Sequence, residues 1–302
     1  MEYKINTKLK GSFSWLNNRP IFASISGGKD SVALGLYLQS KNIEFTPIFI
    51  DTGWEHPSTY EYIKTKLFSL FGEFLIIRNE KYFSNDPEWN GGMEQLIKKK
   101  KMFPSGVIKF CTRDLKIVPI QNFYSEVRTT LKLKPVNAIG IRAEESRKRA
   151  LMQEVEEQDE ATVWRPLLNH KEQEIINIHH ENNVPPNPLY LKGASRVGCY
   201  PCIYARKQEI RHLSQSDPKR IEHIADLEKR VNQLRREDQR QATFFKSTRK
   251  DKKPMDINEI VNWSKQKKNR ILDDQDEIEN GGCMRWGLCE PLIKIGDQLN
   301  LF

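Results

Sequence analysis

The sequence predicts an α/β fold built on a doubly wound parallel sheet, followed by a helical, cysteine-clustered and basic C-terminal part. Through residues 20–205, short apolar runs alternate with helical patterns, which is typical of parallel sheets covered by helices on both faces. Beyond residue 206 the strand signals stop and helical patterns continue. We therefore expect a sheet domain over residues 1–205 and a basic helical region over 206–302.

The first expected strand and the first expected helix flank a glycine-rich turn. Residues 21–25 are short and apolar, as expected for a buried parallel strand. Residues 32–38 contain apolar pairs four positions apart, which is helical spacing. Further strands are expected at 45–50, 74–77 and 136–141, and further helices at 59–71, 115–130 and around 175–178.

Two polar segments between these elements are expected to be loops. Residues 80–110 include a lysine run at 98–101 and are expected to form a lid. Residues 143–163 are rich in charge and are expected to loop over the site at the end of the sheet.

The C-terminal region carries an apolar stripe at helical spacing. The stripe predicts a packing face. Coiled-coil pairing is the alternative, and the small number of heptads disfavours it. Asp256 is expected to cap a helix that runs through Trp263. The members of the stripe are Ile221, Ile224, Leu227, Val231 and Leu234.

Composition indicates a globular, cytoplasmic protein without a membrane segment. Hydrophobic residues make up 38% of the 302 residues and charged residues 29%. No apolar run approaches the roughly 18–20 residues that span a bilayer, and the N-terminus has no apolar core of a secretory signal. The five cysteines form one single and two close pairs, which favours metal or redox chemistry over a disulfide framework.

The net charge of +9 is concentrated in one segment. Residues 206–270 hold 19 lysines and arginines against 10 aspartates and glutamates, a surplus of 9, so the remainder of the chain is neutral. Such a surplus is a candidate footprint for DNA or RNA. The alternative is a solvated helical surface.

The turn after the first strand has the chemistry of a phosphate site. Its glycines let backbone amides approach an anion, and the following helix adds the partial positive charge of its N-terminus. Lys29 supplies a full charge, and Asp30 would orient Lys29 or a metal ion. The spacing differs from the Walker loop, and the alternative is a simple helix-capping turn. The turn consists of Ser26, Gly27, Gly28, Lys29, Asp30 and Ser31.

Two other polar groups follow expected strands directly. Asp51 comes after the strand at 45–50, and Arg142 comes after the strand at 136–141. In parallel α/β sheets, ligands bind beyond the carboxyl ends of the strands. We therefore expect both side chains to lie near the glycine-rich turn.

The turn resembles the PP-loop of the adenine-nucleotide α-hydrolases, and four further groups of residues resemble motifs of the phosphoadenosine-phosphosulfate (PAPS) reductase family. The resemblance covers about residues 20–205 and implies a PP-loop nucleotide-binding domain within residues 1–205. The motifs are Asp51-Thr52-Gly53-Trp54-Glu55-His56-Pro57; Phe110-Cys111-Thr112-Arg113-Asp114-Leu115-Lys116 with Pro119; Gly140-Ile141-Arg142 with Glu145, Ser146 and Arg149; and Trp164-Arg165-Pro166-Leu167 with Asn187-Pro188-Leu189-Tyr190 and Gly198-Cys199-Tyr200-Pro201-Cys202.

The resemblance implies binding of ATP, or of PAPS or adenylyl sulfate (APS), together with Mg²⁺. Lys29, Asp30, Cys111 and Arg149 would take part in catalysis. The alternative for Asp51 is that it caps its turn, and the alternative for Arg142 and Arg149 is that they are surface residues of a charged loop. Lys116 is either an anion contact or a solvated lysine. The nucleotide would be bound by Ser26, Gly27, Gly28, Lys29, Asp30, Ser31, Asp51, Thr52, Gly53, Gly140 and Arg142.

The late cysteines suggest a metal centre. Cys199 and Cys202 have metal-ligand spacing, and some relatives hold a 4Fe–4S cluster on such a pair plus two adjacent cysteines upstream. Here the upstream site is Cys111 followed by threonine, so one ligand of that set is missing. Either Cys283 and Cys289 complete a four-thiolate site, which two close pairs favour, or Cys111 and one late cysteine join the pair. The resemblance favours 4Fe–4S, with Zn²⁺ and scattered buried cysteines as alternatives.

One departure concerns the reaction. PAPS reductases carry a nucleophilic cysteine in a C-terminal Glu-Cys-Gly-Leu-His motif, which residues 295–302 lack. We therefore expect cleavage of ATP between its α- and β-phosphates for sulfur transfer to an acceptor. Segment 206–270 favours nucleic acid as this acceptor, and a sulfur-donor or reductant protein is expected as partner. This is similar to the DNA phosphorothioation sulfurtransferases. The alternatives are a true sulfonucleotide reductase and a non-catalytic nucleic-acid-binding or regulatory protein.

Overall fold

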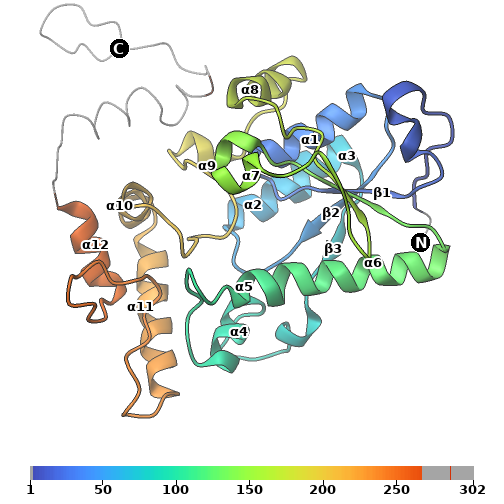
Figure 1. The fold of residues 1–302 in the computed structure, drawn as a ribbon. Coiled ribbons are helices and arrows are strands. Elements are labelled where there is room, and N and C mark those ends of the chain that lie inside the picture. The colour runs from blue at the N-terminus through green and yellow to red at the C-terminus, as the bar shows by residue number, and fades with distance from the viewer. Residues whose placement is uncertain (1–2, 267–285, 287–302) are drawn as a thin grey trace, which may run out of the picture.

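A six-stranded sheet lies at the centre of the computed structural model, in which residues 3–266 and Trp286 are described (Figure 1). The strand order is β3-β2-β1-β4-β6-β5, and all neighbouring pairs are parallel except β5 with β6. The prediction of a doubly wound parallel α/β sheet is therefore confirmed. The strands are β1 (Ile21–Ser24), β2 (Thr46–Ile50), β3 (Leu75–Ile77), β4 (Val136–Ile139), β5 (Val155–Glu157) and β6 (Thr162–Trp164).

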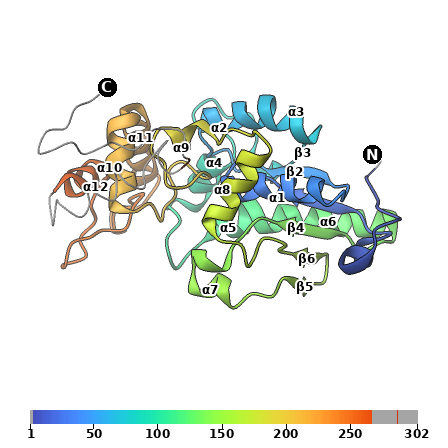
Figure 2. The same cartoon turned by 90° about the horizontal axis from the view of Figure 1, so that it is seen from above.

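Helices cover both faces of the sheet (Figures 1 and 2). Helix α6 runs along one face, whereas α1, α8 and the continuous run from α2 to α3 lie on the other. No helix among residues 3–266 is both long and apolar enough to cross a bilayer. The helices of this part are η1 (Gly11–Leu16), α1 (Lys29–Ser40), α2 (Pro57–Tyr62), η2 (Ile63–Leu67), α3 (Phe68–Phe71), η3 (Glu80–Tyr82), α4 (Met93–Lys100), α5 (Phe110–Thr112), η4 (Arg113–Ile117), α6 (Val118–Leu131), η5 (Ala143–Glu145), α7 (Arg147–Ala150), α8 (Glu172–Glu181) and α9 (Pro188–Leu191).

Strand β1 sends alternate side chains into two separate cores. Ile21 and Ala23 pack with α1 and α8 on one face, while Phe22 packs with α6 on the other. The ring of Phe22 lies 5.0 Å from that of Phe123 and 5.7 Å from that of Tyr124, between ring centroids. Burial on both faces explains why the strand is a continuous apolar run in the sequence.

The chain reverses its direction of travel across the sheet at β1. From β1 it proceeds to β2 and β3 on one side, and it then returns to place β4 on the other side. The loops that follow β1 and β4 therefore meet at the carboxyl end of the sheet, where doubly wound folds bind ligands. Gly140, which follows β4, permits a very close approach, because a Cβ atom there would lie 2.3 Å from the Asp30 carbonyl oxygen.

Two segments expected to be loops contain regular structure. Residues 80–110 include helix α4, whose Met93, Leu96 and Ile97 are buried. These three apolar residues have helical spacing, but the lysines that follow them dominate the composition. Residues 143–163 include α7, strand β5 and most of β6, and β5 forms the antiparallel edge of the sheet.

The C-terminal part consists of helices with a buried apolar face. Ile221, Ile224, Leu227 and Val231 are buried, which confirms the predicted packing stripe, and Leu234 is 36% exposed at its end. Asp256 caps the last helix as predicted, since its Oδ1 accepts a hydrogen bond from the Glu259 backbone N–H at 2.9 Å. The helices are α10 (Lys207–Ser216), α11 (Pro218–Gln233) and α12 (Ile257–Lys265).

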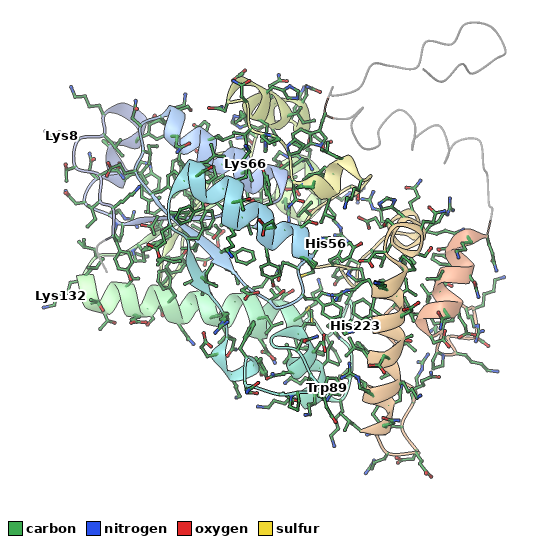
Figure 3. All side chains as sticks on the ribbon, turned by 180° about the vertical axis from the view of Figure 1, so that it is seen from behind. Lys8, His56, Lys66, Trp89, Lys132 and His223 are labelled. Atoms are coloured by element: carbon green, nitrogen blue, oxygen red, sulfur yellow. The ribbon has the colours of Figure 1, made fainter. Side chains whose placement is uncertain are left out.

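Helices α10–α12 share one hydrophobic core with the region around α4 (Figure 3). Trp54 and Trp89 belong to the same cluster as the apolar stripe of α11. Across this contact, His223 Nε2 lies 2.8 Å from Oε1 of Glu94, a carboxylate that is only 2% exposed. The domain boundary between residues 205 and 206 stays a prediction, and the hydrophobic packing extends across it.

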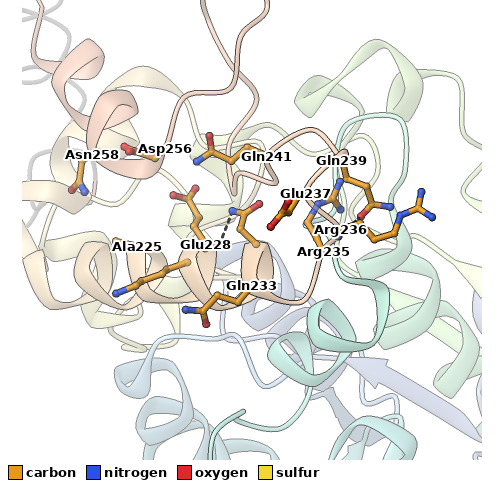
Figure 4. Close-up of a pocket in the computed structure, with 12 residues that line it drawn as sticks. Ala225, Glu228, Gln233, Arg235, Arg236, Glu237, Gln239, Gln241, Asp256 and Asn258 are labelled. Carbon is orange, nitrogen blue, oxygen red and sulfur yellow. Dashed lines mark hydrogen bonds between the residues drawn. The ribbon is translucent and has the colours of Figure 1, made fainter.

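The C-terminal layer consists of helices α10–α12 and the segment between α11 and α12. Glu228 of α11, labelled in Figure 4, contacts both that segment and the start of α12. Its side chain is buried in α11, and its two oxygens accept hydrogen bonds from the backbone N–H groups of Phe244 at 2.7 Å and Ile257 at 2.9 Å. Burial raises the pKa of Glu228 to about 7, although both hydrogen bonds act to lower it. The carboxyl is therefore protonated in the folded chain at pH values where an exposed glutamate is ionised.

We predict that the free energy of unfolding falls as pH rises from 5 to 8, by about 1–3 kcal/mol through Glu228 alone. The sign follows from linkage: the folded chain holds a proton that the unfolded chain releases above its ordinary pKa near 4.5. Glu228→Gln removes this titration. In urea unfolding experiments, the free energy of unfolding of the wild type should therefore fall relative to that of the variant as pH rises. Parallel pH profiles of the two proteins would contradict the prediction.

Candidate functional site

The turn between β1 and α1 is held by its own serines. Ser31 Oγ donates a hydrogen bond to the Gly28 carbonyl at 2.8 Å and accepts one from the Ser26 backbone N–H at 3.0 Å. Gly28 occupies the N-cap position of α1 and has no side chain to cap it. The helix N-terminus therefore begins within the turn, as an anion site requires.

Lys29 is fixed by two residues that lie at least 150 positions later in the chain. Its backbone N–H donates to Tyr190 Oη at 3.1 Å, and its carbonyl accepts from His179 Nε2 at 2.9 Å in the tautomer that this contact requires. Burial lowers the pKa of His179, which favours the neutral ring. The Lys29 ammonium is 7% exposed and lies 3.1 Å from Glu172 Oε1 and 3.6 Å from Asp30 Oδ2.

Arg142 reaches the same carboxylate from the loop after β4. Its Nε donates to Asp30 Oδ1, its Nη1 pairs with Glu144, and its side chain is only 4% exposed. Its backbone N–H donates to Glu145 Oε2 at 2.8 Å, and Glu145 also pairs with Arg149. The structure thus brings together Lys29, Asp30 and Arg142, and it connects Arg149 to them through Glu145.

Asp51 lies within its own turn after β2. Its Oδ1 accepts hydrogen bonds from the Gly53 backbone N–H at 2.9 Å and from Tyr60 Oη at 2.7 Å. This geometry matches the turn-capping alternative for Asp51. Glu55 accepts from Thr52 Oγ1 at 2.7 Å and from Tyr60 at 3.0 Å, and burial beside Glu55 and Asp51 raises the pKa of Tyr60.

The turn after β2 touches the start of α4 through main-chain atoms. Gly53 has a φ of +66°, and a Cβ atom there would lie 2.3 Å from the Gly91 carbonyl oxygen. A Cβ atom at Gly92 would lie 2.0 Å from the Thr52 carbonyl oxygen, which also accepts a hydrogen bond from the Met93 N–H at 2.9 Å. Both sides of this contact therefore require glycine.

The segment after β2 also contacts the loop of residues 198–202, which contains Cys199 and Cys202 and is called the cysteine loop below. Glu55 and Cys199 form an antiparallel bridge, and the Tyr200 N–H donates to the Trp54 carbonyl at 2.8 Å. Trp54 Nε1 donates to the Pro201 carbonyl at 3.0 Å. Arg220 of α11 lies 3.8 Å from the Trp54 ring centroid, and its Nε donates to the Tyr200 carbonyl at 2.8 Å.

Three cysteines share one neighbourhood with a lysine. The Cys199 thiol raises the pKa of Lys116, while burial raises the pKa values of Cys199 and Cys111. Cys202 also raises the pKa of Cys111, which indicates that Cys111 lies near the Cys199–Cys202 pair. Within residues 3–266, no three or more His, Cys, Asp or Glu side chains form a group that could hold a metal ion. Cys283 and Cys289 lie outside the described residues.

Trp286 is buried against the helices that hold Lys29. Its ring lies 5.1 Å from His179 and 5.6 Å from Tyr190, between centroids, and Val197 packs against the same cluster. In the sequence Trp286 stands midway between Cys283 and Cys289. Sequence reasoning did not single it out, because a lone tryptophan carries no pattern.

Sequence reasoning also missed Glu172 and Arg220. Both are isolated charged residues on polar helix surfaces, and only tertiary contacts reveal their partners. A cavity of about 580 Å³ lies over α11 in the C-terminal layer (Figure 4). A smaller cavity of about 70 Å³ lies beside Cys199 and Cys202. Charge and burial therefore locate the candidate phosphate site better than cavity size does.

The sheet order and the buried cations define a doubly wound α/β fold with a candidate phosphate site at its switch point. Residues 20–205 match the phosphoadenosine phosphosulfate reductase domain family, and the chain belongs to this family. The family identified from the sequence motifs is thereby confirmed.

Relatives and solved structures extend this comparison. An uncharacterized 37.8 kDa protein of Escherichia phage 186 is 30% identical over 273 residues, covering 74% of this chain and 78% of that protein. An uncharacterized protein of Methanocaldococcus jannaschii is 24% identical over 213 residues, covering 67% of this chain but 40% of the relative. PAPS reductase from Candida auris has a TM-score of 0.45 at 20% identity, covering 63% of this chain and 86% of that chain. FMN adenylyltransferase from Candida glabrata has a TM-score of 0.41 at 17% identity, covering 63% and 58%.

Proposed function

We propose that this protein binds ATP at the turn after β1 and cleaves it between the α- and β-phosphates to activate an acceptor for sulfur transfer. The observation that carries the proposal is the buried pair of cations, Lys29 and Arg142, joined by Asp30 at the N-terminus of α1. Cations at a helix N-terminus are suited to phosphate oxygens. Membership of the PAPS reductase family supports an adenine nucleotide as the ligand.

The proposed reaction needs positioning and charge neutralisation more than covalent help from the protein. A nucleophilic atom of the acceptor would attack the α-phosphorus, and pyrophosphate would leave with the electron pair of the broken P–O bond. Lys29 and Arg142 would stabilise the charge that develops on the phosphate oxygens. Asp30 supplies a carboxylate of the kind that Mg²⁺ prefers, and bound Mg²⁺ would neutralise the leaving pyrophosphate.

Sulfur chemistry would take place at the cysteine loop. We propose that Cys199 and Cys202 provide two thiolates of a 4Fe–4S site, with Zn²⁺ as the alternative. Burial of Trp286 beside Val197 supports Cys283 and Cys289 as the other two ligands, because these cysteines flank Trp286 in the sequence. The proximity of Cys111 supports its use either as the sulfur-carrying nucleophile or as a replacement ligand.

A sulfonucleotide reductase is the second candidate. The name of the matched family favours it, and Lys29 and Arg142 would serve a sulfonucleotide as well as ATP. Cys111 would then be the candidate nucleophile. Side-by-side turnover of ATP and PAPS under anaerobic conditions separates the two functions.

A basic groove supports nucleic acid as the acceptor. The groove, about 330 Å³, lies between residues 102–106 and the segment 240–247, and Ile203 next to Cys202 forms part of its wall. Arg235, Arg240 and Lys246 line it, and its described lining includes no acidic residue. Cations without nearby carboxylates favour a polyanion. An acidic partner protein, such as a sulfur donor, is the alternative occupant.

We predict that Lys29→Ala weakens ATP binding by about 1.5–3 kcal/mol, or about 10- to 150-fold, because it removes a charge-assisted phosphate contact. Pyrophosphate release should fall to background while thermal melting stays close to wild type. Lys66→Ala, an exposed lysine on another helix (Figure 3), is the control. Unchanged pyrophosphate release in the Lys29 variant would rule out the proposed ATP site.

We predict that anaerobically purified protein contains iron and sulfide and is brown, and that Cys199→Ser and Cys202→Ser both lose the metal. Cys111→Ser is the discriminating control. It should keep the full metal content if Cys283 and Cys289 complete the site, and lose it if Cys111 is a ligand. A colourless protein with stoichiometric zinc would instead support a structural thiolate site.

We predict that DNA or RNA binding is strongly salt-dependent and largely insensitive to sequence, because phosphate contacts release counterions. Charge reversal of Lys250, Lys252 and Lys253 to Glu should weaken binding and flatten its salt dependence without changing ATP turnover. Reversal of Lys8, Lys66 and Lys132, which lie away from the C-terminal layer (Figure 3), is the matched control. Absence of binding by wild type at about 50 mM salt would leave the acidic-partner alternative.

A further inference from the structure

Each buried cation of the candidate phosphate site has one inner and one outer carboxylate partner. Asp30, with its side chain 15% exposed, is the inner partner of both Lys29 and Arg142. The outer partner of Lys29 is Glu172, which is 32% exposed. The outer partner of Arg142 is Glu144, which is 46% exposed.

The two outer glutamates come from different segments, and the backbone of Glu172 is hydrogen-bonded to the carboxylate of Glu144. Glu172 is the first residue of α8, and its backbone N–H donates to Glu144 Oε1 at 2.8 Å. The N-terminus of α8 therefore stabilises negative charge next to Lys29 and Arg142. Asp30 is fixed between two cations, whereas the partly exposed Glu172 side chain has access to water.

We infer that Glu172 is the counterion that a ligand phosphate must displace from Lys29, so that this residue sets the affinity of the site for phosphate-bearing ligands. The inference rests on the proposed function, because it takes Lys29 as a phosphate contact. Glu172 Oε1 already lies at 3.1 Å from the Lys29 ammonium. A phosphate oxygen at hydrogen-bond distance from the same nitrogen would lie next to a like charge.

The same ion pair has a stabilising role that explains its presence. A lysine ammonium that is 7% exposed is unfavourable without nearby anions, and Asp30 alone is shared with Arg142. Glu172 therefore supplies a second anion for the Lys29 ammonium and helps to hold it in place. Its partial exposure lets it move into water when another anion takes its place.

The test measures ligand affinity after removal of this one charge. Glu172→Gln should lower the Kd for ATP and for inorganic pyrophosphate by about 3- to 10-fold in calorimetric titrations, both with Mg²⁺ and with a chelator. Glu181→Gln, the same change at the exposed last residue of α8, should leave both values at the wild-type level. Glu172→Asp, which keeps the charge, should stay closer to wild type than Glu172→Gln does.

An unchanged or higher Kd for Glu172→Gln overturns the inference, and so does a loss of affinity confined to the Mg²⁺ titration, which would assign the carboxylate to the metal. If Glu172→Gln does not fold by circular dichroism, Glu144→Gln tests the same displacement at Arg142 and should also tighten binding. The proposed function is checked separately. Wild type that binds neither ligand contradicts both ideas. Binding that Lys29→Ala weakens and Glu172→Gln leaves unchanged contradicts only the counterion role.

Discussion

The carboxylate of Asp30 joins Lys29, at the start of α1, to Arg142, in the loop after β4. Neither cation could remain buried without such a partner, because a desolvated charge is costly unless it is paired. The pairing requires β1 and β4 to be neighbours and the two loops to meet in main-chain contact at Gly140. The order of the sheet, the burial of the cations and the location of the candidate site thus depend on one another.

Local sequence patterns predicted the central part of the fold because its elements are uniform in character. Strand β1 is apolar on both faces, and α1 has a regular apolar repeat, so each could be identified without knowledge of its neighbours. Helix α4 was assigned to a loop because its apolar residues are few and its last turn is lysine-rich. Strand β5 was missed for a similar reason: an edge strand with exposed charged residues lacks an apolar pattern.

The candidate site was predictable where a motif marks it and unpredictable where only tertiary contacts do. Lys29 and Arg142 follow strands whose carboxyl ends meet in any doubly wound sheet. Asp30 joins them from the residue after Lys29. Glu172 and Arg220 come from helices more than a hundred residues beyond the turn, and nothing in their local sequence specifies what they contact.

The glycine contact between the turn after β2 and the start of α4 has a mechanical consequence. Thr52 and Gly53 meet Gly91 and Gly92 through main-chain atoms alone, so no side-chain rotation can absorb a displacement there. Helix α4 in turn packs against α11, which carries Arg220 to the cysteine loop. A displacement of the turn after β2 would therefore move the start of α4 directly, through the backbone, and side-chain packing between α4 and α11 would pass that movement on to the C-terminal helices.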